Sequence, residues 1–306
     1  MTLPLTVLKQ TLTMALYITM GFVLFKSKKI TLAGSKDLAT LLLWLVVPAM
    51  LINSFCVPYS QEKLREFGVS FLMGLLALLL SMAVAALLFR KDALENLAVA
   101  FSNAAFMGIP LVRQSLGEEA VFYLVGFVAA LNLFQWCYGL FLLGGPKSKR
   151  SWRGVLASPV VLGSLIGFLI FVTGLGNKLP GVVDGALKGV AAVNAPLAMI
   201  VLGVYLAQTQ LTSLITTPRL YLLSGVRLVL IPLATLGVFT LLPAPNAIRL
   251  TLLIAASAPI GSNAAVYAQI YGRDYPYACT AVAQSTALSI LTLPQMVTLA
   301  QWAWGM

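Results

Sequence analysis

Long, uninterrupted apolar runs are the feature of this sequence that most restricts its fold. Each covers about 18 to 25 residues, the length that an α-helix needs to cross the hydrocarbon core of a membrane. Of the 306 residues, 60% are hydrophobic and only 9% are charged. A soluble domain could not cover so much apolar surface with so few charges, and outer-membrane barrels alternate in polarity at every second residue. The chain is therefore predicted to be an all-α polytopic membrane protein.

Charged and Gly/Pro-rich breaks divide these runs into ten predicted transmembrane helices. Their ranges are 5–25, 38–57, 67–89, 96–114, 119–143, 155–175, 185–207, 219–242, 247–271 and 277–304. The fourth and ninth spans contain a proline close to a glycine and are the least like ordinary membrane helices.

The proline positions indicate an internal repeat. Pro48 and Pro196 are 148 residues apart, and Pro110 and Pro259 are 149 residues apart. Because five is odd, a second set of five helices would enter the membrane upside down relative to the first, as in many secondary carriers. Chance is the alternative, since prolines are common in membrane helices.

The repeat predicts three segments along the chain. They are a first five-helix repeat at 1–143, a basic cytoplasmic loop at 144–154 and a second, inverted five-helix repeat at 155–306.

Basic residues set the predicted orientation. Twelve lie in the loops after the odd-numbered spans, and six lie on the opposite side. The positive-inside rule then places the first group in the cytoplasm and both termini outside, in the cell (inner) membrane. The net charge of +11 arises mainly from these residues at the ends of spans, so no nucleic-acid partner is expected.

A proline and a glycine interrupt both unusual spans. Gly108 is two residues before Pro110, and Gly261 is two residues after Pro259. A proline removes a helical hydrogen bond and clashes with the preceding turn. The freed backbone groups survive in a membrane only where protein buries them or they line a wet cavity. Paired breaks in inverted halves indicate a carrier's substrate site, although kinks that only shape helix packing are the alternative.

An asparagine accompanies each predicted break. Asn103 is seven residues before Pro110, and Asn263 is four residues after Pro259. Because the two spans run in opposite directions, both amides are expected on the cytoplasmic side of their breaks. An amide can donate to a carboxylate, so both residues are candidates for binding an organic acid. Each could instead bond to a neighbouring helix.

Three further polar residues inside the spans are candidates for the site. Asn132 lies in the fifth span and Asn194 lies two residues before Pro196; each could line a cavity or bond between helices. Arg227 lies inside the eighth span, where a charge must face the interior. It would either attract an anionic substrate or bind the carbonyls of a broken helix.

Other kinds of site have no signal in the sequence. The nine acidic residues lie in loops or near span ends and the chain has no histidine, so an intramembrane proton relay is not expected. No zinc motif, phosphate loop or nucleophile–base pair is present, which argues against an enzyme, a metal or a cofactor. The motifs "GSLIG" at 163–167 and "GALKG" at 185–189 predict close helix packing or a dimer contact.

Several segments resemble the auxin efflux carrier family, which includes the plant PIN-formed proteins and bacterial relatives. They are "NAAFMGIPLV" at 103–112, "APIGSNAAVYAQIYGRD" at 258–274, "WCYGLFLL" at 136–143, "RLVLIP" at 227–232 and Pro294. The resemblance implies inverted repeats in which the fourth and ninth helices cross at their prolines. It also implies a scaffold of helices one, two, six and seven, often dimeric, beside a mobile transport domain of helices three to five and eight to ten. In plant members the asparagine that matches Asn103 contacts a carboxylate substrate, and a polar residue near Asn132 contributes.

The leading hypothesis is therefore a secondary transporter that exports small organic acid anions by alternating access. The expected partners are the organic acid, membrane lipid and a second copy of the chain, bound through the scaffold helices. A sodium-coupled symporter of the bile-acid type is the first alternative, because that superfamily shares the crossed-helix plan. A membrane sensor that binds a ligand without transporting it is the second.

Overall fold

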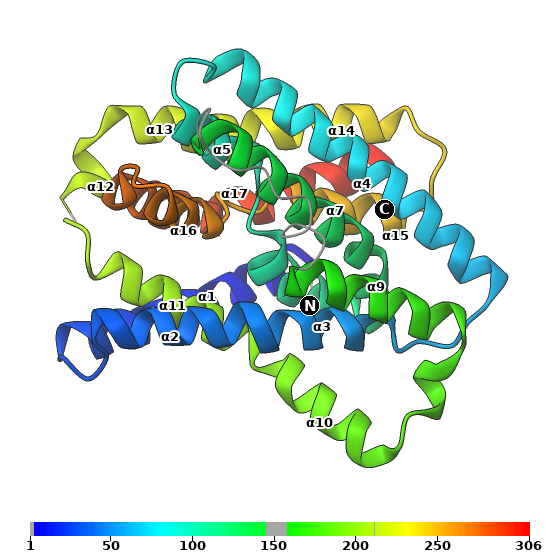
Figure 1. Cartoon of the computed structure of the whole chain (residues 1–306). Helices are drawn as coiled ribbons and strands as arrows, with labels where there is room; N and C mark the ends of the chain where they lie inside the picture. The colour runs from blue at the N-terminus through cyan, green and yellow to red at the C-terminus, as the bar shows by residue number, and fades with distance from the viewer. Residues whose placement is uncertain (1–2, 145–157, 211) are drawn as a thin grey trace.

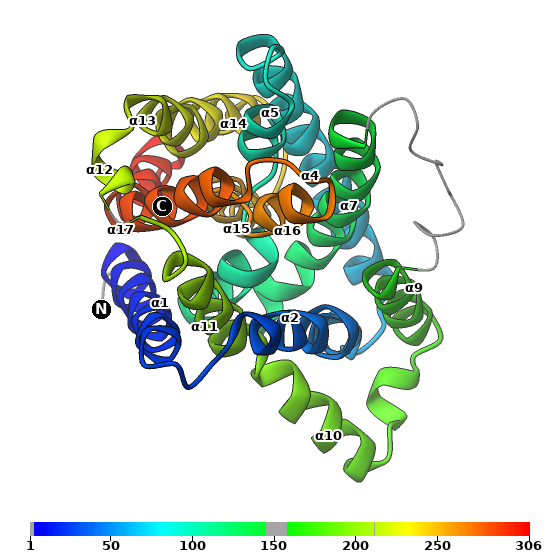
Figure 2. The same ribbon diagram turned by 60° about the vertical axis from the view of Figure 1, so that its left-hand side comes forward.

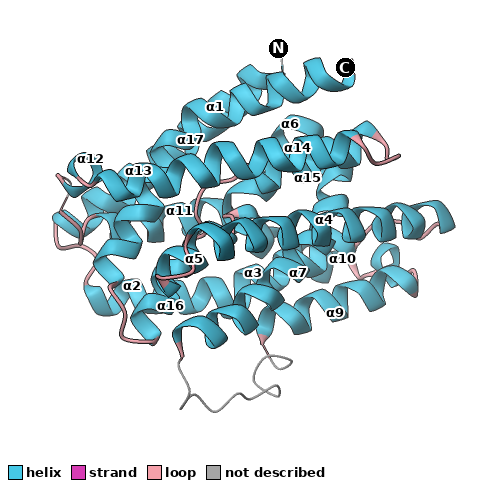
Figure 3. Cartoon of the chain, turned by 90° about the horizontal axis from the view of Figure 1, so that it is seen from above, coloured by secondary structure: helices cyan, strands magenta, loops and turns pink. Residues whose placement is uncertain are grey.

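The computed structural model describes residues 3–144, 158–210 and 212–306, which fold into helices with no strand among them (Figures 1 and 3). The first half contains α1 (Leu3–Lys26), α2 (Leu32–Leu41), α3 (Val47–Phe55), α4 (Gln61–Leu88), α5 (Ala93–Ala100), α6 (Ile109–Leu116) and α7 (Glu118–Leu143). The second half contains α9 (Pro159–Val172), α10 (Gly181–Ala192), α11 (Asn194–Leu206), α12 (Ser213–Thr216), α13 (Pro218–Gly225), α14 (Ile231–Thr240), α15 (Asn246–Ala256), α16 (Asn263–Ile270) and α17 (Tyr275–Trp304). The predicted basic loop lies, beyond Gly144, outside the described residues.

Six helical stretches in the described part of the chain are long and apolar enough to cross a membrane. They are Leu5–Lys26, Leu32–Phe55, Gln61–Leu88, Glu118–Leu143, Gly181–Leu206 and Pro218–Thr240. Shorter apolar helices occur at Pro159–Val172 and Asn246–Ala256. In hydrocarbon a helix satisfies its own backbone hydrogen bonds, so the prediction of an all-α polytopic membrane protein is confirmed.

Helices from the two halves of the chain are packed against each other. In the lower half of Figures 1 and 2, α1 packs along α11, and α3 packs on α9 and α10. In the upper part, α4 packs on α5 and α7, while α15 contacts α4, α7 and α17. The two groups meet where α1 contacts α6 and α17.

Glycines permit the closest helix contacts. A Cβ atom at Gly203 of α11 would lie 1.9 Å from the backbone oxygen of Ile18 in α1, and one at Gly21 would lie 2.0 Å from that of Ile200. The "GSLIG" motif has the same role, because a Cβ at Gly163 would lie 2.9 Å from Pro48 Cα of α3. Its predicted close packing is confirmed.

The second small-residue motif behaves differently. At Gly185 and Gly189 of "GALKG", an added Cβ would meet no atom of the described chain within 4 Å. The two glycines of this motif therefore make no close helix contact with described residues, and the predicted dimer contact stays a prediction.

Three prolines follow a π-helical turn. The turns η1 (Leu42–Val46), η2 (Ala104–Gly108) and η4 (Val226–Leu230) precede Pro48, Pro110 and Pro232, each of which is the second residue of the next α-helix. The residue before each proline donates its N–H to the carbonyl five residues back. A proline ring clashes with the carbonyl four residues before it, and the extra residue of a π turn relieves that contact.

The fourth predicted span is broken at a different place from the one expected. Helix α5 ends at Ala100, the π turn begins at Ala104, and the chain is unwound between them. Pro110 lies inside the helix that follows, because the π turn accommodates it. Asn103 thus lies in the break itself, and no helical segment separates it from the break. The ninth span is broken where expected, since Pro259 lies in the unwound residues between α15 and α16.

The α1–α11 contact leads to a test of the packing. Replacing Gly203→Ala places a methyl group against the α1 backbone, so the helices must separate, at a cost of about 1–3 kcal/mol for overpacking. We expect a lower melting temperature for the purified variant in detergent.

Gly185→Ala is the matched control, because it makes the same chemical change at a helix position that has open space around it. Alanine favours a helix over glycine by up to about 1 kcal/mol, so the control should keep or raise the melting temperature. Equal destabilisation by both changes would contradict the proposed close contact.

Candidate functional site

Two unwound segments cross where the fourth and ninth predicted spans are broken. Ser102 and Ile260 form an isolated antiparallel bridge. The N–H of Asn103 donates to the carbonyl of Pro259 at 2.8 Å, and the N–H of Gly261 donates to that of Phe101 at 3.0 Å. Each unwound segment therefore satisfies backbone groups of the other, which a membrane interior requires.

The two candidate glycines differ in their importance for the crossing. A Cβ at Gly261 would lie 3.2 Å from the backbone oxygen of Ser102 and 3.3 Å from that of Phe101. A side chain at Gly261 would therefore crowd the other unwound segment. A Cβ at Gly108 would make ordinary contacts, 3.4 Å from Ala104 Cβ and 3.6 Å from Ala255 Cα. Only Gly261 is required by close approach of the backbone.

Arg227 binds the C-terminal ends of both broken helices. Its Nη1 donates to the carbonyl of Val99 in α5 at 3.2 Å and to Ser81 Oγ at 2.9 Å. Its Nε donates to the carbonyl of Ala258 at 3.2 Å, and its Nη2 donates to that of Ala256 at the end of α15. The side chain is 1% exposed. The sequence left two roles open for Arg227. In the structure it binds the carbonyls of the broken helices, whereas direct contact with a substrate stays a prediction.

Amide side chains gather at the N-terminal ends of the following helices. Asn103 immediately precedes η2, and Asn263 is the first residue of α16. Asn263 Nδ2 donates to Gln135 Oε1 of α7 at 3.0 Å. Asn103 Nδ2 and Gln135 Nε2 are buried and have no hydrogen-bond partner in the described structure. Since helix N-termini carry partial positive charge, this group of amides, with its two unpaired donors, suits an anionic acceptor.

The structure separates the other candidate residues. Asn132 is half-buried, and its Nδ2 donates to the carbonyl of Val128 in its own helix at 2.8 Å. Asn194 is buried; its Nδ2 donates to the carbonyl of Ala105 at 3.3 Å and lies 3.8 Å from the sulfur of Met50. Its Oδ1 has no partner among the described atoms. Asn194 thus contacts η2, whereas Asn132 makes no described bond to the crossing.

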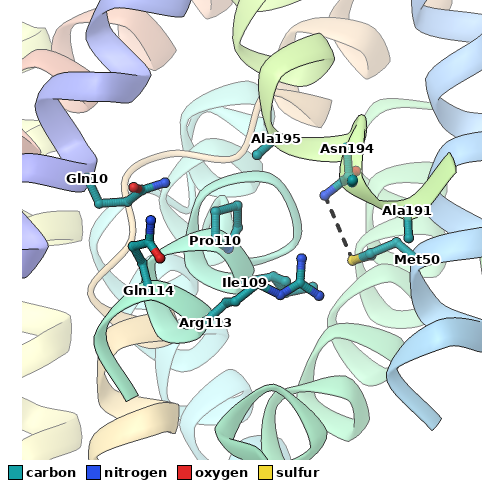
Figure 4. Close-up of a pocket in the computed structure, with 10 residues that line it drawn as sticks. Gln10, Met50, Ile109, Pro110, Arg113, Gln114, Ala191, Asn194 and Ala195 are labelled. Atoms are coloured by element: carbon teal, nitrogen blue, oxygen red, sulfur yellow. Dashed lines mark hydrogen bonds between the residues drawn. The ribbon is translucent and has the colours of Figure 1, made fainter. Parts of the chain in front are cut away.

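Two cavities lie between the helices that follow the breaks and helices α1, α2 and α11. The Gln10 cavity has a volume of about 110 Å³ and is lined by Gln10, Pro110, Arg113, Gln114 and Asn194 among others. Figure 4 shows Gln10 of α1 on one side, Asn194 of α11 on the other, and Pro110 between them. The Asn263 cavity is smaller, about 20 Å³, and lies between the α2–η1 and α11 residues on one side and Phe106 and Asn263 on the other.

Each helical part of the broken fourth span carries an ion pair. Arg113 Nε lies 2.9 Å from Glu118 Oε1. The nearly buried Glu95 of α5 forms an ion pair with Arg219 of α13 at 2.5 Å and accepts a hydrogen bond from the Tyr277 hydroxyl of α17 at 2.8 Å. The Glu95 contacts join α5, α13 and α17. No group of three His, Cys, Asp or Glu side chains in the described ranges could hold a metal ion.

Two residues of the crossing were not among the predicted site residues. Gln135 lies three residues after Asn132, so it occupies a neighbouring position on the same helix. Only its contact with Asn263 in the structure identifies it as part of the candidate site. Ser81 donates its hydroxyl to the carbonyl of Ala100 at 2.7 Å, and a serine in an apolar helix carries no comparable signal in the sequence.

Comparison with known proteins agrees with this architecture. The sequence profile of the family described as "Membrane transport protein" matches residues 6–297. An uncharacterized transporter from Methanothermobacter thermautotrophicus is 24% identical over 298 residues, which cover 92% of this chain and 95% of that protein. Since the family profile spans almost the whole chain, the protein belongs to the membrane transport protein family, which includes the auxin efflux carriers, and it is a multi-pass membrane transporter rather than an enzyme.

Proposed function

We propose that the protein is a secondary transporter of small organic acid anions and that the substrate carboxylate binds at the helix crossing. The observation that carries this proposal is the pair of buried, unpartnered amide donors on Asn103 and Gln135. A buried donor without an acceptor costs about 1–3 kcal/mol. A carboxylate would satisfy both donors through charge-assisted hydrogen bonds, which are the stronger kind.

Helix dipoles support the same choice of ligand. The combined helix of η2 and α6 and the helix α16 both begin at the crossing, beside Asn103 and Asn263. Their N-terminal ends favour a negative charge. The opposite ends of the broken helices are occupied by Arg227, which leaves the N-terminal side as the part of the crossing that is suited to an anion.

The finer architecture that we propose has ten transmembrane helices in two inverted five-helix repeats. In this arrangement the broken pair α5 and α6 corresponds to the broken pair α15 and α16. The antiparallel bridge between Ser102 and Ile260 supports this correspondence, because it joins the unwound segment of one proposed repeat to that of the other.

Alternating access would come from motion between two groups of helices. The predicted scaffold corresponds to α1–α3 and α9–α11, and the predicted transport domain to α4–α7 and α13–α17. Both cavities are lined by residues of both groups. Rocking of the transport domain would therefore enlarge one cavity while it closes the other.

The predicted orientation of the chain decides which side of the membrane each cavity faces. With both termini outside, as the Lys/Arg bias predicts, the Asn263 cavity faces the cytoplasm and the Gln10 cavity faces the exterior. We propose export, in which the acid reaches the amides from the Asn263 cavity and leaves past Pro110 and Asn194.

Asn103→Ala tests the site. It removes an amide donor from the crossing, and a hydrogen bond to a charged group contributes about 1.5–3 kcal/mol. We expect the affinity for a transported acid to fall by about tenfold to a hundredfold, measured as KM in proteoliposomes after a screen of organic acids.

The control for that experiment is Asn177→Ala, which removes an exposed amide far from the crossing in sequence. It should transport like the unaltered protein. An Asn103→Ala variant with unchanged KM and rate would refute the assignment of the site.

Gln135→Glu tests the sign of the charge. The two side chains have nearly the same shape, but the substitution replaces the unpaired Nε2 donor with a carboxylate oxygen. Repulsion of the substrate should abolish uptake at acid concentrations that saturate the unaltered protein, while Gln135→Met should retain residual transport. Equal transport by the Glu and Met variants would argue against an anion at this position.

Sodium dependence separates the proposed transporter from a sodium-coupled symporter. The described residues offer no acidic group at the crossing to balance an added sodium ion. We therefore expect the same initial transport rate when sodium is replaced by potassium on both sides of the membrane. A rate that requires sodium would favour the symporter.

A further inference from the structure

We propose that the Arg227 guanidinium is a resident cation that fills the site where a broken-helix carrier would otherwise bind a coupling metal ion. The inference rests on the proposed function of a secondary transporter. It concerns the C-terminal ends of the broken helices rather than the N-terminal ends where the amides lie, and it assigns Arg227 the role of a positioning residue rather than a substrate ligand.

The oxygen atoms around Arg227 resemble a ligand set for a hard cation. They are three backbone carbonyls, of Val99, Ala256 and Ala258, and the Ser81 hydroxyl. Unwound backbone carbonyls and half-helix C-terminal ends are the groups that coordinate sodium in transporters with discontinuous helices. Here three nitrogens of one side chain donate to all four oxygens, so a guanidinium takes the place of the metal ion.

The charges balance without an acidic side chain. No carboxylate of the described chain forms an ion pair with Arg227, although its side chain is 1% exposed. Each helix C-terminus carries about half a negative charge, and α5 and α15 both end at the guanidinium. Together the two ends offset about one positive charge. A second cation at this place would be uncompensated.

The remaining space excludes a second cation on steric grounds as well. The cavity beside Arg227, lined by Ser81, Ser102, Phe127 and Ala256 among others, has a volume of about 10 Å³. One water molecule needs about 10–15 Å³, so a metal ion with its own ligands does not fit while the guanidinium is present.

Tethering has a mechanistic consequence. A mobile ion binds from one side of the membrane and leaves on the other, which couples its gradient to the substrate. Arg227 is covalently held by η4 and moves with the helices that it joins. It stabilises the crossing in every state of the transport cycle without contributing an ion gradient.

The test is the cation dependence of an Arg227→Ala variant purified in detergent. The substitution leaves all four oxygens of this ligand set around a vacated volume, so a small cation should bind there. A ligand that binds only the folded state raises stability, and we expect a rise in melting temperature on the order of 5 °C with millimolar sodium or guanidinium, relative to choline. The unaltered protein should show no such rise.

Arg249→Ala is the matched control. Arg249 also donates to a backbone carbonyl, that of Leu242. Unlike Arg227, it does not join the C-terminal ends of two broken helices. Its melting temperature should be the same in sodium and in choline. An Arg227→Ala protein that is as stable as the unaltered one, or that does not respond to either small cation, would overturn the proposal.

If Arg227→Ala does not fold, Arg227→Lys decides the question. A positive charge is sufficient in our proposal, so the lysine variant should fold and remain indifferent to sodium. Failure of the lysine variant as well would mean that guanidinium packing, not charge, is required, and would overturn the proposal.

These measurements need no substrate, so they are independent of the proposed acid. A sodium-specific rise in the melting temperature of the unaltered protein would overturn this inference and leave anion binding at Asn103 intact. Unchanged transport by Asn103→Ala would overturn the substrate site and leave the role of Arg227 intact.

Discussion

The structure depends on how backbone groups are satisfied where two helices are broken inside an apolar environment. An unwound segment in hydrocarbon loses several hydrogen bonds, each expensive to leave unmade. Here the two segments pair with each other through the Ser102–Ile260 bridge. The carbonyls left at the ends of α5 and α15 are bound by Arg227 and Ser81. The crossing is therefore a hydrogen-bonded junction between helices of both halves rather than a pair of unpaired breaks.

The crossing also separates helix ends by charge. The C-terminal ends of α5 and α15 face a buried cation, and the N-terminal ends of η2 and α16 lie beside the amides of Asn103, Asn263 and Gln135. With the first pair of ends neutralised, the second pair retains its attraction for an anion. The proposed acid site would thus need no positively charged side chain in direct contact with the substrate, and the proposed role of Arg227 is to hold the helix ends in place.

Prolines predicted the broken spans well but not the position of each break. In the ninth span the break includes Pro259, whereas in the fourth it lies seven residues before Pro110. The same π turn precedes Pro48, Pro110 and Pro232, and in each case the helix continues through the proline. A proline therefore marks a local helical irregularity, and only a crossing partner decides whether the chain unwinds.

The sequence by itself determined the class of the protein, because long apolar runs with few charges have one stable solution in a membrane, the helix. It also determined which spans are irregular and that Asn103 and Asn263 accompany them. The pairing of Asn263 with Gln135 and the four oxygens around Arg227 were decided only by the tertiary structure. These contacts join residues that are more than a hundred positions apart or lie on different helices. Such hydrogen-bond partners depend on how whole helices pack, and no local sequence pattern encodes that packing.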